Sequence, residues 1–261
     1  MKKRVVSALI ACLIIIPLFL IGGIPFRLLI GVISMLAYKE ILTLKEHHKT
    51  LPVSIMAIGL VCLLCIVFMT YDSYALFLGF SYQAVSLTIM SLLIPSVFIK
   101  KNYDTKTAFY LIGFVILLGT LFNSILMINA YNKWLLLYIV LTVCITDIFA
   151  YLIGSLIGKH KISTISPKKS LEGCIAGSLM GTIIPSFYLM SILPVSPIYA
   201  IVTSLVLSIM GQLGDLIFSK IKRENDIKDF SNIMPGHGGI LDRLDSLSFA
   251  MFAYIIISTL I

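Results

Sequence analysis

The chain consists largely of apolar runs close to the ~20 residues that a helix needs to cross a ~30 Å hydrocarbon layer. Hydrophobic residues make up 59% of it and charged residues only 12%, against about 25% charged in a typical soluble domain. The apolar segments are 5–21, 24–44, 51–69, 74–99, 107–129, 133–157, 172–193, 197–218 and 245–261. We therefore expect an integral membrane protein.

The segments fit helices better than strands. The stretch 10–21 is apolar nearly throughout, whereas the strands of a membrane barrel alternate apolar and polar residues over about 10 positions. A helix also pairs its backbone N–H and C=O groups within one segment, as lipid requires. The predicted fold class is an all-α, polytopic transmembrane helical bundle of about nine spans. We divide it into N-terminal transmembrane helices, 1–131, and a C-terminal region, 132–261, which carries the polar loops 158–171 and 219–244.

Basic residues predict the orientation, because Lys and Arg accumulate in cytoplasmic loops. A cytoplasmic N-terminus places 17 of the 20 Lys and Arg residues on the inner side. The segments concerned are 1–4, 45–50, 100–106, 158–171 and 219–244. The net charge of +8 therefore reflects topology and attraction to anionic membrane lipids, about 1 kcal/mol per basic residue near the surface. It does not indicate nucleic acid as a partner. The predicted location is the cell membrane, as a multi-pass protein.

Acidic residues within apolar segments are informative, because a charge at the bilayer centre costs at least ~2.5–3.5 kcal/mol. Asp147 lies in the middle of a predicted span, and Asp215 lies near the cytoplasmic end of another. Both are candidate functional residues, with a helix-to-helix hydrogen bond as the alternative. Glu172 begins a span, where an acid also complements the helix dipole, so a structural role explains it equally well.

The longest polar stretch separates the last two apolar segments. Its glycines at 236, 238 and 239 allow backbone N–H groups to approach a phosphate closely, and a loop that opens a helix points those donors at an anion. Asp242 and Asp245 are three residues apart and share one helix face. Carboxylates suit Mg²⁺, which commonly takes one or two of them together with substrate phosphates. This stretch therefore predicts a phosphate and magnesium site.

The same stretch resembles the signature of the phosphatidate cytidylyltransferase family. The matching residues are Ser219, Lys222, Arg223, Lys228, Asp229, Ser231, Pro235, His237, Gly238, Gly239, Asp242, Arg243 and Asp245. Met234 stands where the family usually has Leu, Ile or Phe, and it keeps the apolar character.

A second stretch, from Asp147 to Gly173, is similar to the region that precedes this signature in the family. It departs from the family at Ser155, where Arg is frequent, and at Ser170 and Leu171, where Thr and Trp are usual. Both stretches lie within 132–261, which the resemblance makes the catalytic region.

The resemblance implies a CTP-dependent nucleotidyltransferase of phospholipid biosynthesis. It would convert CTP and phosphatidic acid into CDP-diacylglycerol and pyrophosphate, with Mg²⁺ as cofactor, at the cytoplasmic side of the membrane. The attacking phosphate oxygen is already an anion, so catalysis consists of bringing anions together and neutralising charge. We assign Asp215 and Asp242 as the leading metal ligands, with Asp245 and Asp147 as second-site or orienting ligands.

Basic and small residues of the two loops are assigned to the substrates. Catalytic roles on the triphosphate and the departing pyrophosphate are expected for Lys222, Arg223 and Lys228, together with His237, for which a structural loop role is the alternative. Substrate binding is expected for Lys168, Lys169, Ser219, Gly238, Gly239 and Arg243.

Other functions are left open by the residues. The acceptor could be another lipid phosphate, or the chain could be a CTP-dependent lipid kinase. A cation-coupled transporter would also place Asp147 and Asp215 within the membrane, but it would not need two basic loops on one side, and the paired broken helices of many transporters are not visible here. The ladder Gly173, Gly177 and Gly181 lets one helix pack closely on a neighbour, and it also fits a homodimer contact.

The orientation predicts which positions an impermeant thiol reagent can reach. A cysteine placed at Ser163 or Asn225 should react only after the membrane is opened, because both positions lie in loops assigned to the cytoplasm. The measurement is labelling of intact and permeabilised cells. Reaction from outside intact cells would contradict the orientation and would remove the access of the site to cytosolic CTP.

Overall fold

A computed structural model describes residues 2–44, 51–69, 82–99, 103–163, 166, 169–233, 236 and 238–259. Its regular structure in these ranges is helical, apart from isolated bridge residues such as the pair Lys161 and Ser170. The helices are α1 (Lys2–Ile21), α2 (Gly23–Leu42), α3 (Val53–Val67), α4 (Tyr82–Leu93), α5 (Pro95–Phe98), α6 (Thr105–Ile157), α7 (Leu171–Ile192), α8 (Pro197–Glu224) and α9 (Leu241–Thr259). The predicted all-α class is confirmed.

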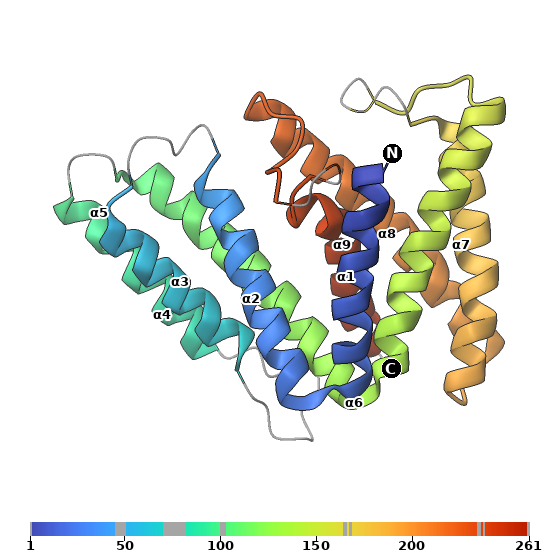
Figure 1. The fold of residues 1–261 in the computed structure, drawn as a ribbon, viewed down its shortest axis with the longest axis horizontal. Helices are drawn as coiled ribbons and strands as arrows, with labels where there is room; N and C mark the ends of the chain where they lie inside the picture. The colour runs from blue at the N-terminus through green and yellow to red at the C-terminus, as the bar shows by residue number, and fades with distance from the viewer. Residues whose placement is uncertain are drawn as a thin grey trace. The chain divides into compact units, whose positions relative to one another are not determined.

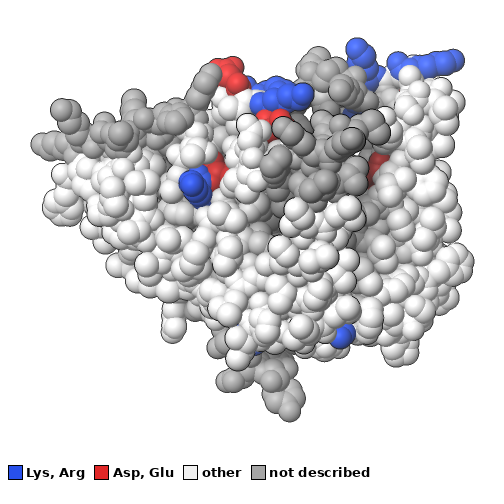
Figure 2. All heavy atoms as spheres, viewed as in Figure 1, with Lys and Arg blue, Asp and Glu red and all other residues white. Residues whose placement is uncertain are grey.

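Among the described helices, α6, α7 and α8 are long and apolar enough to cross a membrane. Shorter apolar helical stretches lie at 9–21, 53–67 and 83–98. Large apolar side chains such as Leu13, Phe109 and Leu156 are more than 60% exposed, and Figure 2 shows that most of the described surface in view carries no charged side chain. An apolar exterior over helices of this length is that of a membrane protein.

The predicted break between two spans near residue 132 falls inside α6. Asn132 has non-helical angles, φ −155° and ψ 107°, and its side-chain oxygen accepts a hydrogen bond of 3.0 Å from the backbone N–H of Trp134. This is the geometry of an N-cap residue. The 53 residues of α6 therefore consist of two helical halves, 105–131 and 133–157, in agreement with the two predicted segments.

The chain divides into two compact units, which are described separately. The first unit is Met1–Ala130 with Asp229–Asp242, and the second is Tyr131–Lys228 with Arg243–Ile261. In the first unit, Asn123 on α6 donates hydrogen bonds of 3.0 and 3.1 Å to the carbonyls of Val67 and Met69. These bonds satisfy acceptors that the end of α3 leaves without helical partners.

In the second unit, α7 packs on the 133–157 half of α6, and the two run side by side in Figure 1. A Cβ atom at Gly177 would lie 2.7 Å from the carbonyl oxygen of Thr146 and 2.9 Å from the Cβ of Ala150. Gly173 and Gly181 face the same half-helix. The glycine ladder is thus a close helix contact, as predicted.

The exposed fractions refine the labelling positions. Asn225 is only 6% exposed, because it follows α8 and donates from its side chain to the carbonyl of Ile221 at 2.9 Å. The neighbouring Glu224 side chain is 61% exposed. Glu224 is therefore the better position for a cysteine on this side of the second unit.

The helix contact at Gly177 predicts a stability difference between two glycine substitutions. Gly177→Ala should lower the stability by about 1–3 kcal/mol, since the new methyl group overpacks the contact with α6. Gly113→Ala is the control, because its Cβ position has no neighbour within 4 Å beyond the adjacent residues and the backbone of its own helix turn, and alanine should be neutral or slightly stabilising there. Thermal unfolding in detergent measures both. Equal stability of the two variants would contradict the packing.

Candidate active site

In the second unit, an ion pair joins the loop before α7 to α8. The Lys169 ammonium group, which precedes α7, contacts the carboxylate of Asp215 on α8. The other oxygen of Asp215 accepts a hydrogen bond of 3.3 Å from the hydroxyl of Ser219, one turn further along α8. The Lys169 and Asp215 side chains are 23% and 25% exposed. Three predicted site residues are thus brought together by the loop before α7 and by α8.

Two further acids interact with this pair. Asp147, in the second half of α6, interacts electrostatically with Lys169 and Asp215. Asp245, in α9, interacts with Asp215, Lys222 and Asp147. Lys222 is only 9% exposed, which is rare for a lysine without an acidic neighbour. The four elements of the second unit therefore converge on one cluster of three aspartates and two lysines.

The ligand atoms of the cluster can be compared with those that Mg²⁺ prefers. Within the described ranges, no three His, Cys, Asp or Glu side chains are grouped closely enough to hold a metal ion by themselves. Mg²⁺ does not require such a set, because it commonly takes one or two carboxylates and completes its shell with water and substrate phosphates. The carboxylate oxygens of the cluster fit that preference.

Asp242 is held within the first unit. Its Oδ2 accepts hydrogen bonds of 2.9 Å from the backbone N–H groups of Phe230 and Gly239. Gly238 has φ +84°, and a Cβ there would lie 2.8 Å from the same oxygen. The Asp242 carboxylate therefore closes the glycine-rich loop, a structural role that the sequence did not suggest.

Glu40 on α2 is a buried acid that the sequence analysis did not single out. It is 1% exposed. Its Oε1 accepts from the Ser231 hydroxyl at 2.6 Å and from the Ile240 N–H at 2.8 Å, and its Oε2 accepts from the Leu241 N–H at 2.9 Å. The rule that singled out Asp147, an acid inside an apolar segment, applies equally to Glu40 and could have found it.

The loop amides were predicted to bind a substrate phosphate. In the structure the N–H of Gly239 binds Asp242, and those of Ile240 and Leu241 bind Glu40. These three donors are occupied by carboxylates of the chain itself. The loop thus behaves as an anion site at a helix start, with the anions supplied by the protein.

The other predicted residues are placed as follows. Lys228 and Arg243 are exposed, and the exposed Arg223 donates from Nη1 to the carbonyl of Ile227 at 3.1 Å. His237 and Lys168 lie outside the described residues.

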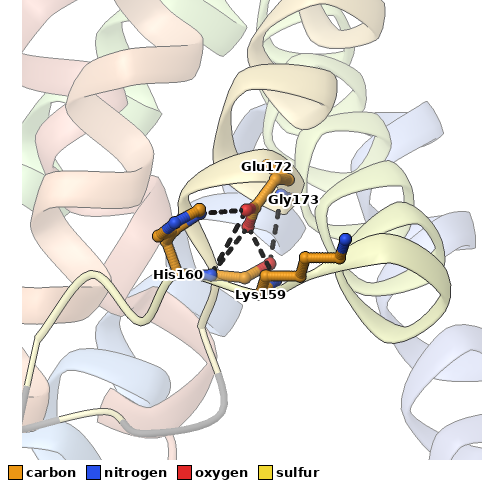
Figure 3. A network of polar contacts seen from close by, with 5 residues as sticks. Lys159, His160, Glu172 and Gly173 are labelled. Carbon is orange, nitrogen blue, oxygen red and sulfur yellow. Dashed lines mark hydrogen bonds and ion pairs between the residues drawn. The ribbon is translucent and has the colours of Figure 1, made fainter.

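Glu172 anchors the loop that carries Lys169, as Figure 3 shows. Its carboxylate accepts from the backbone N–H groups of Lys159 at 3.1 Å and His160 at 3.2 Å, and it contacts the His160 ring nitrogen Nδ1 at 2.6 Å. Ser170 caps α7 by accepting from the N–H of Gly173 at 3.1 Å. These contacts support a structural role for Glu172.

The fold and the cluster define an all-α membrane protein in which acids and lysines gather between helices. Residues 2–260 match the Cytidylyltransferase family, and the chain belongs to that family. The phosphatidate cytidylyltransferase of Bacillus subtilis (strain 168) is 35% identical over 272 aligned residues, which cover 99% of this chain and 98% of that protein. The phosphatidate cytidylyltransferases of Staphylococcus haemolyticus (strain JCSC1435) and Staphylococcus aureus (strain COL) are 34% and 33% identical, each over 96% of both chains.

The Glu172 contacts predict a local change without loss of the fold. Glu172→Ala should speed amide hydrogen exchange at Lys159 and His160 by about tenfold, since hydrogen bonds to a charged acceptor are the stronger ones. Glu224→Ala is the control, because Glu224 lies at the exposed end of α8, where its carboxylate pairs with the Lys220 ammonium group at 3.7 Å. Mass spectrometry of exchange in detergent measures both. Unchanged exchange at Lys159 and His160 would contradict the anchoring role.

Proposed function

We propose that this chain is a phosphatidate cytidylyltransferase, which transfers a cytidylyl group from CTP to phosphatidic acid and forms CDP-diacylglycerol and pyrophosphate. The observation that carries the proposal is the cluster of Asp147, Lys169, Asp215, Lys222 and Asp245, contributed by four elements of the second unit. Relatives named for this activity align with nearly the whole chain. Acids that would hold a cation and lysines that would hold phosphates are what the reaction requires.

The reaction forms one phosphorus–oxygen bond and breaks another. A phosphate oxygen of phosphatidic acid attacks the α-phosphorus of CTP, and the bond to pyrophosphate breaks on the opposite side. Because the nucleophile is an anion, positioning and charge neutralisation supply the catalysis. Lys222 is fixed by burial, so it presents a charge in one place. Lys169 can exchange its contact with Asp215 for a contact with a substrate phosphate.

The carboxylates define where Mg²⁺ would bind. We propose Asp215 and Asp242 as leading ligands, and Asp245 and Asp147 as second-site or orienting ligands. When bound, the ion would neutralise phosphate charge and polarise the oxygens that it contacts. In the structure, the positive charge of Lys169 partly neutralises the Asp215 carboxylate.

The finer topology belongs to the same proposal. About nine spans with a cytoplasmic N-terminus would place the loops 158–171 and 219–244 beside cytosolic CTP. Support comes from the basic residues of those loops and from the match between the predicted segments and the helices. A homodimer also belongs to the proposal, although the glycine ladder that suggested it packs on α6 of the same chain.

The test uses the purified chain in detergent with Mg²⁺, labelled CTP and separate lipid acceptors. Phosphatidic acid should give a lipid-soluble product that carries the cytidine label, together with pyrophosphate. A lipid that instead gains the γ-phosphate, with release of CDP, would identify the kinase alternative. Product only with another lipid phosphate would identify the related cytidylyltransferase.

The metal assignment predicts the effect of two substitutions. Asp215→Asn and Asp242→Asn should each lower the rate by at least about tenfold, because an amide keeps the shape but not the charge that holds a hard cation. The double variant should be little slower than either single one, since residues that act as one unit are non-additive. Initial rates across a Mg²⁺ titration measure this, with Glu224→Gln as the control. Near-normal rates of both single variants would contradict the assignment.

A further inference from the structure

The end of α2 and the loop before α9 meet at one carboxylate in the first unit. Glu40 is 1% exposed, and both of its oxygens are engaged by groups about 190 to 200 positions later in the sequence. The partners are the hydroxyl of Ser231 and two backbone N–H groups at the start of α9. A buried carboxylate with three donors around it is fully satisfied, so the contact fixes the loop at two separate points.

The donors require an acid and exclude an amide. Ser231, Ile240 and Leu241 all donate, and the last two bind different oxygens of Glu40. A glutamine has only one acceptor oxygen, and its NH₂ group would face a backbone N–H. The three donors of the loop therefore require a carboxylate at position 40, and a side chain of the same size without a second acceptor oxygen would not satisfy them.

Gly239 lies so close to Glu40 that the contact leaves no room for a side chain at this position. A Cβ at this position would lie 2.6 Å from Oε1 and 2.7 Å from Oε2 of Glu40. The N–H of Gly239 points to the other side of the loop, where it binds Oδ2 of Asp242. Glu40 and Asp242 thus bind the amides of adjacent residues in the loop. A side chain at position 239 would displace the Glu40 carboxylate.

We propose that Glu40 is a positioning residue for the reaction: it clamps the loop from Ser231 to Leu241 and so fixes where Asp242 lies at the start of α9. The amides of Ile240 and Leu241 serve this clamp, and the neighbouring amide of Gly239 binds Asp242. The inference rests on the proposed function, because Asp242 is a ligand only in that context.

The first experiment compares Glu40→Gln with Ser34→Ala. Ser34 is the matched control, because it is also buried in α2 but donates only to Gly31 of its own helix, at 2.8 Å. Glu40→Gln should lower kcat by at least about tenfold, since a 1 Å misplacement can cost ~10²-fold. It should also speed amide hydrogen exchange over 230–241 without Mg²⁺ or substrates. Ser34→Ala should change neither. Exchange or kcat in Glu40→Gln equal to wild type would overturn the proposal.

The second experiment separates positioning from general loss of folding. Gly239→Ala should be slow, because its methyl group displaces the Glu40 carboxylate. Adding Glu40→Asp, whose side chain is one methylene shorter, should restore at least about fivefold of the lost rate by making room. A double variant no faster than Gly239→Ala would overturn the proposal. If wild type forms no labelled lipid at all, the proposed function fails, whereas the exchange comparison still tests the clamp.

Discussion

The pairing of carboxylates governs this structure, because the chain has few charges and surrounds them with apolar residues. An acid in such a setting is stable only when donors or cations surround it. Glu40 is satisfied by a hydroxyl and two amides, whereas Asp215 is satisfied by Lys169 and Ser219. The positions of the helix ends and loops follow from these contacts.

The two kinds of partner have different consequences for function. A carboxylate bound by backbone amides has fixed partners, so Glu40 is suited to hold a loop. A carboxylate bound by a lysine side chain can exchange that partner, because a lysine reaches its contact through a flexible stem. Under the proposed function, Asp215 and Lys169 would separate to receive a cation and a phosphate. We therefore assign the exchange of partners during the reaction to Asp215, and the support of the loop to Glu40.

Much of the fold could be predicted because lipid limits a chain to a few solutions. The predicted segment 172–193 differs from α7 by one residue at each end, and the predicted break between 129 and 133 contains Asn132. The glycine ladder was predicted to be a helix contact and is one. The extent of the fourth segment was not settled, since residues 70–81 lie outside the described ranges.

The sequence by itself determined the helical class, the membrane environment and the residues that resemble a family signature, because these depend on composition and on local spacing. It did not determine which donors meet which carboxylates. Glu40 and Ser231 are 191 positions apart, and no local pattern connects them. The glycine-rich loop likewise suited a phosphate in the sequence, and only the tertiary structure showed that Glu40 and Asp242 bind the N–H groups of Gly239, Ile240 and Leu241. Such contacts are decided by packing, because a hydrogen bond needs its donor within about 3 Å of its acceptor.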